Sequence, residues 1–387
     1  MKKKRVIVFG GDGYLGWPVS MFLSNLNYKV LSVDNYDKRK ISKKLNIKPI
    51  FPVSSLKLRT KIWNRISKKN EVEFKILNIC NYKELVDLFK KFKPDSVIHF
   101  AEQPSAPYSM KGYSEASYTL QNNLITTFNI IQASKETGIF PHIVKLGTMG
   151  EYGTPNIDIE EGFIEIAHKN REGKFLFPRQ GGSLYHTTKI LDTDLLYFYV
   201  RAWGLKVTDL MQGPVYGLFT NETELDEKLN TCFYYDSIFG TIINRFVVQA
   251  INGVPLTVYG KGNQKRGYIN IKDTLKCIHI ALSNPPKSGE MKIFNQFTEI
   301  FTVNELAEIV REAGLSSGIN SIDIKKIKNP RIELEEHYYN PINTEFQKLG
   351  LKSEKLKIET LEKLIRYLSK YKNNIDRSQI LPNVNWT

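Results

Sequence analysis

Tyr185 and Lys189 stand four residues apart, in the order Tyr-x-x-x-Lys. On a helix, residues at this spacing share one face, so the ammonium group would lie close to the phenol. The positive charge would lower the pKa of the tyrosine, and the phenolate could then remove a hydroxyl proton as hydride leaves the same carbon. The pattern recurs by chance in many sequences, so this chemistry needs supporting residues elsewhere in the chain.

A glycine-rich segment near the start of the chain supplies that support. It lies between an apolar run and a helical stretch, has the spacing Gly-x-x-Gly-x-x-Gly, and comprises Gly10, Gly11, Asp12, Gly13, Tyr14, Leu15 and Gly16. Glycines permit a tight turn and close approach to a pyrophosphate, which the free N–H groups at the helix start would bind. Asp34 and Asn35 follow the second strand, where a carboxylate binds ribose hydroxyls. This favours NAD over NADP, although Lys38 and Arg39 follow closely.

Thr148 and His186 extend the group of candidate catalytic residues. Thr148 follows the predicted strand His142–Leu146, at the strand end where ligands bind in parallel sheets, and its hydroxyl could hydrogen-bond a reacting oxygen. His186 adjoins Tyr185, and a histidine there could move protons near neutral pH. The order of the glycine loop, Asp34, Thr148 and the Tyr185–Lys189 pair therefore predicts an NAD-dependent enzyme.

The elements that must position these residues alternate between short apolar strands and amphipathic helical stretches. Strands are predicted at Val6–Phe9, Lys29–Val33, Glu71–Leu77, Ser96–Phe100, His142–Leu146 and Lys206–Leu210, and helices at Tyr14–Asn25, Tyr82–Phe92, Asn122–Ser134 and Ser183–Ala202. The alternation predicts an α/β fold, with a Rossmann-type doubly wound parallel sheet and a smaller C-terminal α/β substrate-binding domain. We expect residues 1–212 to form the NAD-binding domain, with a returning segment near 247–290. Residues 213–246 and 291–387 would form the second domain, in which long irregular segments are expected at Leu218–Tyr235 and Asn320–Asn340.

Composition and charge limit the class of protein. The 387 residues are 41% hydrophobic and 25% charged, which are ordinary globular values. No apolar run approaches the ~18 residues that a membrane span needs, so a cytoplasmic protein without a membrane or targeting segment is expected. The net charge of +15 comes from dispersed lysines without a nucleic-acid-binding motif, which favours a lysine-rich solvated surface, with attraction of an anionic substrate as a contributor, over nucleic-acid binding. Three scattered cysteines lack disulfide or zinc spacing, so no metal is expected.

Six longer segments are more specific than these motifs. They are Ala101–Met110, Lys145–Glu161, Ser183–Lys189, Thr208–Gly217, Val258–Tyr268 and Asn329–Tyr339. Together with a glycine spacing typical of extended short-chain dehydrogenases/reductases, they resemble the UDP-sulfoquinovose synthase family from Val6 to about Trp386. The resemblance implies tightly bound NAD, oxidation of UDP-glucose at C4, elimination of water across C5–C6, addition of sulfite or an equivalent donor at C6, and reduction of C4. It also implies a homodimer, as is common among extended family members.

The same resemblance implies further site residues. Arg266 and Arg331 would bind the diphosphate, Val258 and Tyr259 would line the uridine, and Gln212 would face the sugar. The other residues implied at the cofactor are Asn78, Ile79, Ala101 and Asn123, and those implied at the substrate are Gln103, Ser105, Thr148, Tyr216, Arg245 and Gln264.

Some positions depart from the patterns of related families. Sugar 4,6-dehydratases carry an Asp-Glu pair where this chain has Met149 and Gly150, which leaves Glu151 as the candidate acid or base. Asn78 replaces a usual aspartate, and Pro104 replaces a usual arginine and offers an anion no donor. Two alternatives therefore stay open: an NDP-sugar 4-epimerase or dehydratase without sulfur transfer, or a synthase paralogue with another nucleotide sugar. A non-catalytic NAD- or RNA-binding protein is a further alternative, supported by charge alone.

Overall fold

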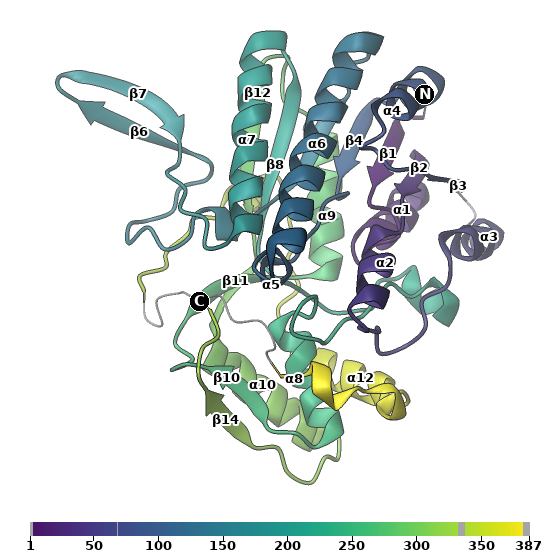
Figure 1. The fold of residues 1–387 in the computed structure, drawn as a ribbon, viewed down its shortest axis with the longest axis vertical. Coiled ribbons are helices and arrows are strands. Elements are labelled where there is room, and N and C mark those ends of the chain that lie inside the picture. Colours follow the sequence, from purple (N-terminus) through teal and green to yellow (C-terminus); the bar gives the residue numbers. More distant parts are fainter. Residues whose placement is uncertain (1–2, 68, 332–336, 382–387) are drawn as a thin grey trace.

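A seven-stranded parallel sheet forms the centre of the molecule (Figure 1). The computed structural model describes residues 3–67, 69–331 and 337–381, and the strand order is β12-β8-β5-β4-β1-β2-β3. This order and the parallel pairing confirm the predicted Rossmann-type α/β sheet. The strands are β1 (Arg5–Phe9), β2 (Lys29–Asp34), β3 (Val72–Ile76), β4 (Ser96–His99), β5 (His142–Thr148), β8 (Lys206–Gln212) and β12 (Glu290–Gln296).

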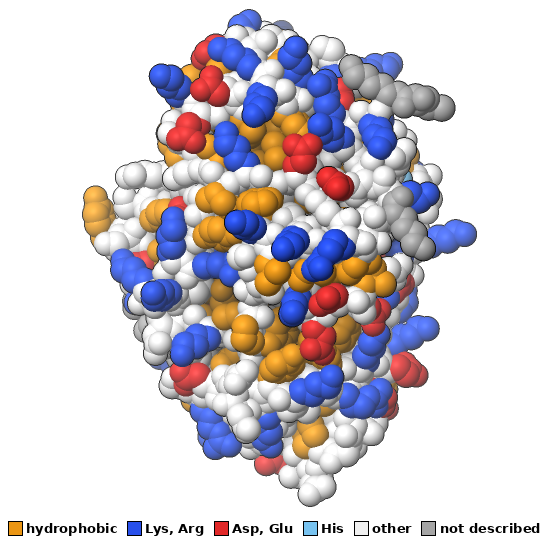
Figure 2. Space-filling view, turned by 90° about the vertical axis from the view of Figure 1, so that its right-hand side faces the viewer, with side chains coloured by type: hydrophobic (Ala, Val, Ile, Leu, Met, Phe, Trp, Pro, Cys, Tyr) orange, Lys and Arg blue, Asp and Glu red, His pale blue; other side chains and the backbone are white. Residues whose placement is uncertain are grey.

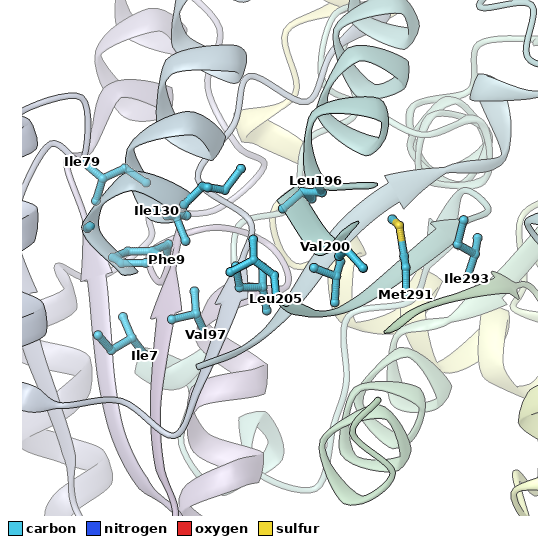
Figure 3. Close-up of a cluster of buried hydrophobic side chains, with 14 of the residues drawn as sticks. Ile7, Phe9, Ile79, Val97, Ile130, Leu196, Val200, Leu205, Met291 and Ile293 are labelled. Atoms are coloured by element: carbon cyan, nitrogen blue, oxygen red, sulfur yellow. The ribbon is translucent and has the colours of Figure 1, made fainter. Parts of the chain in front are cut away.

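Helices bury both faces of this sheet. Side chains alternate along a strand, so Ile7 and Phe9 of β1 face one layer and Val6 and Val8 face the other, and all four are buried. Figure 3 shows the first layer, where Leu196 and Val200 pack beside Leu205. That layer contains α4 (Tyr82–Phe92), α6 (Tyr113–Thr137) and α7 (Leu184–Trp203), and the other contains α1 (Gly16–Asn25), α3 (Leu56–Ile66) and α9 (Ile271–Ser283).

A second, smaller region packs below the sheet in Figure 1 and has its own hydrophobic cluster. Its helices are α8 (Ile242–Asn252), α10 (Val303–Ser316) and α12 (Ile358–Ser369). Its short sheets pair β10 (Leu256–Tyr259) with β14 (Ile324–Ile327), and β11 (Lys265–Asn270) with β13 (Glu299–Thr302) and β9 (Val215–Tyr216).

The expected domain boundaries differ from this arrangement. The segment that returns to the large sheet was placed near 247–290, but most of α8 and all of β10 pack in the smaller region. Conversely, β12 lies within the expected second domain and forms the edge of the large sheet beside β8. The reason is that an apolar run predicts a strand, whereas its pairing partner is chosen by long-range packing.

Several elements were not predicted. They include the hairpin of β6 (Phe163–His168) and β7 (Arg171–Leu176), which extends away from the body in Figure 1. Its turn has Lys169 and Asn170 at positive φ, as a two-residue hairpin turn requires. The short helices α2 (Asp37–Lys44), α5 (Ala106–Ser109) and α11 (Glu345–Lys348) were also missed, and β14 lies inside a segment expected to be irregular.

The surface carries its basic side chains in a scattered arrangement. On the face shown in Figure 2, Lys and Arg alternate with acidic and uncharged side chains and do not gather into one patch. In the described part of the chain, no helix combines the length and apolar composition of a membrane span.

Candidate active site

A cavity of about 630 Å³ lies at the carboxyl ends of the central strands. Its walls include the glycine loop after β1, Asp34 at the end of β2, Ala101 after β4 and Thr148 at the end of β5. Parallel α/β sheets bind ligands at this edge because the loops there converge. Among the residues predicted at the cofactor, those that line the cavity are Gly10, Asp12, Gly13, Tyr14, Leu15, Gly16, Asp34, Asn35, Asn78, Ile79 and Ala101.

The glycine loop has no room for side chains at Gly10, Gly11 and Gly16. A Cβ at Gly10 would lie 2.7 Å from the carbonyl carbon of Phe100, and one at Gly16 would lie 2.0 Å from the oxygen of Gly10. Gly10 also has a φ of +80°. Gly11 does not line the cavity; it packs against Ser32. The N–H groups from Gly10 to Gly13 are hydrogen-bonded within the protein, so the N–H groups of the next residues, at the start of α1, are the ones that a pyrophosphate could use.

The Asp34 carboxylate fixes this loop from the second strand. It accepts hydrogen bonds from the backbone N–H of Asp12 (2.9 Å) and of Tyr36 (2.7 Å). Burial, and next the charge of Asp12, raise the pKa of Asp34 to about 6. Arg39, the cation expected to compete for an NADP phosphate, instead donates to Asp12 at 2.6 and 2.7 Å. Because Arg39 is paired with Asp12, Asp34 is the group at this position that can bind a ribose.

The segment that follows β9 closes the cavity from the other side. The Thr231 hydroxyl lies 2.8 Å from the carbonyl oxygen of Tyr14, and Trp17 Nε1 donates to the carbonyl of Leu229 at 2.9 Å. The phenol of Tyr14 donates to the carbonyl of Gly217. Cys232, Tyr234, Ile238 and Phe239 continue this wall, and none of them was predicted because the segment lacks periodicity.

Tyr185 and Thr148 both face the cavity. Ser183 caps α7 by accepting the N–H of His186, which places Tyr185 in the first turn and Lys189 one turn later. The Lys189 Nζ lies 6.0 Å from the centre of the Tyr185 ring and donates to the carbonyl of Leu146 at 2.6 Å. The predicted Tyr–Lys–Thr group is therefore assembled at the end of β5.

The pKa of Tyr185 is shifted in the opposite direction to the lowering expected from Lys189. Burial raises the pKa of Tyr185 above its ordinary value, and the charge of Glu102 is the second cause. Glu102 forms an ion pair with Lys189, and both side chains are buried. This carboxylate follows β4 directly and lines the cavity, but the sequence analysis did not select it. The feature of the sequence that could have identified Glu102 is its charge in the loop directly after a predicted strand.

Glu151 lies behind Thr148. It is fully buried, and its Oε1 accepts from Lys145 Nζ and from the backbone N–H of Thr148, each at 3.2 Å. Lys145 also pairs with Asp209 at 3.2 Å. Burial raises the pKa of Glu151, and the charge of Lys145 opposes that shift. Glu151 does not line the cavity, so its geometry supports a role in holding Thr148 and η1 (Met149–Glu151).

His186 points to the same short helix. Its Nδ1 lies 3.1 Å from the Ser183 hydroxyl, and a Cβ at Gly150 would lie 2.3 Å from its Nε2. A side chain at position 150 would therefore have to displace this imidazole.

The loop after β4 carries further predicted residues. Gln103, Ser105 and Gln212 line the cavity. Asn123 lies behind them, accepts the N–H of Gln103 at 2.8 Å, and donates to Thr188 at 3.0 Å. Asn123 thus holds the loop to α7 and lies outside the cavity wall. Pro104 lines the cavity between two buried polar residues.

A basic group lies in the second region. Arg245 is buried one helical turn beyond Thr241, a cavity residue, and donates to the Tyr259 hydroxyl at 2.8 Å. Burial lowers the pKa of Arg245, and the nearby charge of Arg331 lowers it further. Arg331 therefore lies near Arg245 in this region. Arg266 lies 3.0 Å from His337 Nε2, while residues 332–336 of the segment Asn329–Tyr339 lie outside the described residues.

The remaining predicted substrate residues support these groups. Gln264 donates to the carbonyl of Tyr259 at 3.2 Å, and Val258 is buried in β10. The Tyr216 hydroxyl donates to Glu299 at 3.2 Å. None of the three lines the cavity, so the structure places them as packing and support for the second region.

Comparisons with known proteins show the family of this chain. The model of the NAD dependent epimerase/dehydratase family matches residues 6–295. The chain is 47% identical to the chloroplastic UDP-sulfoquinovose synthase of Spinacia oleracea, over 99% of this chain and 79% of that one. It is 42% identical to UDP-sulfoquinovose synthase of Sulfolobus acidocaldarius, over 99% and 97% of the two chains.

Solved structures share the fold. UDP-glucose 4-epimerase from Bifidobacterium longum, solved with NAD+ and UDP, has a TM-score of 0.70 and 19% identity, covering 96% of this chain and all (100%) of that one. UDP-glucuronic acid 4-epimerase from Bacillus cereus, solved with UDP-glucuronic acid and NAD, has a TM-score of 0.68 and 18% identity, covering 95% and 99%. The chain belongs to the NAD-dependent epimerase/dehydratase family, and UDP-sulfoquinovose synthases are among its near relatives.

Proposed function

We propose that this protein is a UDP-sulfoquinovose synthase that converts UDP-glucose and a sulfur donor, sulfite or its equivalent, to UDP-sulfoquinovose. The observation that carries the proposal is identity of 42–47% to two such synthases over 99% of the chain. The assembled Tyr185, Lys189 and Thr148 group supports it, because a redox step at a sugar hydroxyl needs that acid–base machinery.

The cavity fits the NAD that the family requires. The start of α1 offers backbone N–H groups, and Asp34 is held where it can accept from ribose hydroxyls. Lys189 and Asn35 are further candidates to bind the cofactor, because each lies at or behind the cavity wall. When bound, NAD would supply the hydride acceptor and donor for C4 of the sugar.

We assign the acid–base steps to side chains at the end of β5. Tyr185 would take the proton of the C4 hydroxyl and return it when C4 is reduced again, with Thr148 hydrogen-bonded to the same oxygen. A ketone at C4 acidifies the C5–H bond, so a nearby base suffices to remove that proton as O6 leaves as water. His186 is our candidate for the proton at C5 or O6 because it adjoins Tyr185, with ring centres 5.3 Å apart.

The opposite end of the substrate would lie in the second region. Arg245 and Arg331 lie near one another, and they are our candidates to bind the diphosphate because guanidinium groups suit phosphate oxygens. Sulfite would then add at C6 as the C5 carbon regains its proton. Pro104 supplies no donor to the anion, so its binding would depend on backbone N–H groups and on the neighbouring Gln103 and Ser105.

Oligomeric state and location remain predictions. We propose a homodimer through α6 and α7, where exposed apolar side chains include Leu120, Phe128, Leu191 and Phe198. Action in the cytoplasm stays an expectation from the sequence.

The test is mass spectrometry of a reaction with the purified protein, UDP-glucose and NAD, with and without sulfite. The expected result is a sulfite-dependent UDP-sulfoquinovose mass, reduced about 10²- to 10⁴-fold by Tyr185→Phe. Tyr199→Phe on the same helix is the matched control and should retain the rate. A dehydrated or epimerised sugar without a sulfonate would overturn the synthase assignment and favour the 4-epimerase or dehydratase alternative.

A further inference from the structure

A carboxylate stands on the cavity wall at the Tyr185–Lys189 end. Glu102 Oε2 pairs with Lys189 Nζ, and Glu102 Oε1 lies 3.3 Å from His99 Nε2. The side chain is only 2% exposed, and it follows Ala101 in the wall. Among the described residues, no group donates a well-directed hydrogen bond to either of its oxygens. Glu102 is therefore a buried carboxylate on the cavity wall, with Lys189 as its counter-ion.

The surroundings do not neutralise this group fully. His99 is buried, and burial lowers its pKa to about 4, so the imidazole is neutral at physiological pH. The buried cluster around Lys189 contains four carboxyl groups (Glu102, Glu151, Asp192 and Asp209) and two lysines (Lys145 and Lys189). Burial, and then the charge of Glu102, raise the pKa of Asp192 well above its ordinary value. Glu102, whose counter-ion is Lys189, is thus one of several carboxyl groups at this end of the site.

We propose that Glu102 places a fixed negative charge at the hydride-transfer end of the cavity, and that this charge makes the protein bind the cationic NAD+ form more tightly than NADH. Hydride transfer requires the nicotinamide ring to lie beside Tyr185 and Thr148, at the end of the cavity that Glu102 lines. The ring is cationic when oxidised and neutral when reduced, so a buried carboxylate distinguishes the two forms by Coulomb attraction.

Such a preference suits a reaction in which C4 is oxidised and reduced within one turnover. The protein must begin each turnover with the oxidised form bound, and a molecule left with NADH would be inactive. The inference rests on NAD use, which the family shares, and is independent of the sulfur step in the proposed function.

The experiment measures which form the protein retains. The full chain is equilibrated with equal, excess NAD+ and NADH, freed of unbound nucleotide by gel filtration, and the bound nucleotides are quantified by chromatography. The wild type should retain mainly NAD+, and Glu102→Gln should shift the bound ratio about tenfold toward NADH. Lys189→Met should shift it in the opposite direction, because Glu102 then loses its compensating cation.

Controls separate this effect from a structural one. Asp37→Asn removes a carboxylate that lines the same cavity at the Asp34 end, and it should leave the ratio unchanged. Glu102→Asp keeps the charge and should retain most of the preference if Glu102→Gln does not fold. Equal retention of both forms by wild type, or shifts of the same sign in Glu102→Gln and Lys189→Met, would overturn the proposal. Loss of sulfonate formation with an intact NAD+ preference would instead refute the proposed function alone.

Discussion

The glycine loop of the large region and the arginine group of the smaller region are built by different structural means. In the loop, the shape of the backbone decides the site: Gly16 has no room for even a Cβ, and Asp34 holds the turn by backbone hydrogen bonds. In the other region, long side chains from separate segments meet, with Arg245 resting on Tyr259 and close to Arg331. A backbone-built site tolerates few changes, whereas a site of long side chains should weaken gradually.

The largest expected effect concerns the buried charges that hold Thr148. Glu151→Gln removes one partner of Lys145, so the free energy of unfolding should fall by about 3 kcal/mol, measured by urea denaturation. Turnover of the remaining folded protein should change less than tenfold. A loss above 10²-fold with unchanged stability would show instead that Glu151 transfers protons. Glu308→Gln, an exposed member of a surface ion pair, is the control.

The next effect concerns the glycine loop. Gly16→Ala places a Cβ 2.0 Å from the carbonyl oxygen of Gly10, and the backbone must move to admit it. We expect a loss of about 2 kcal/mol in stability together with loss of retained NAD, measured by calorimetry and by nucleotide content. Gly112→Ala is matched, because its Cβ has no neighbour closer than 3.4 Å. If Gly16→Ala keeps its NAD, the loop is more adaptable than its geometry indicates.

A smaller effect is expected in the arginine group. Arg245→Met keeps most of the buried stem and removes the charge, so the dissociation constant for UDP should rise about tenfold in isothermal titration. Arg311→Met, on an exposed arginine of α10, should leave the constant unchanged. Complete loss of UDP binding would mean that the arginine group tolerates substitution no better than the glycine loop does. The two sites would then not differ in the way proposed above.

The last effect is a pH dependence at Asp34. Its pKa of about 6 lies above the ordinary 3.8, so the folded, nucleotide-free protein binds this proton more tightly than the unfolded chain. Its contribution to stability is therefore full below about pH 4 and is lost as pH rises to about 6, by up to about 3 kcal/mol, because each pKa unit corresponds to about 1.4 kcal/mol. Asp34→Asn should flatten this part of the stability profile, measured by thermal unfolding at several pH values. An unchanged profile would assign the dependence to another group.

The same contrast explains what could be predicted from the sequence. The helix predicted at Tyr82–Phe92 matches α4, because its apolar spacing and the Asn81 cap act locally. The glycine loop, Asp34, Thr148 and Tyr185 came from short motifs in which local backbone geometry fixes function. Glu102 and the wall from Cys232 to Phe239 were missed because their positions depend on segments far apart in the sequence. The pairing of β12 with β8 was missed for the same reason.

The contacts between the glycine loop and the segment after β9 bear on how the chain matures during synthesis. Tyr14 reaches Gly217, Trp17 reaches Leu229, and Thr231 returns to Gly13. Partners more than 200 positions apart must both have left the ribosome before these contacts close. A nascent chain ending near residue 212 would hold its central strands and the loop but lack the closing wall. The chain should thus bind NAD only late in its synthesis, when most of its residues have left the ribosome.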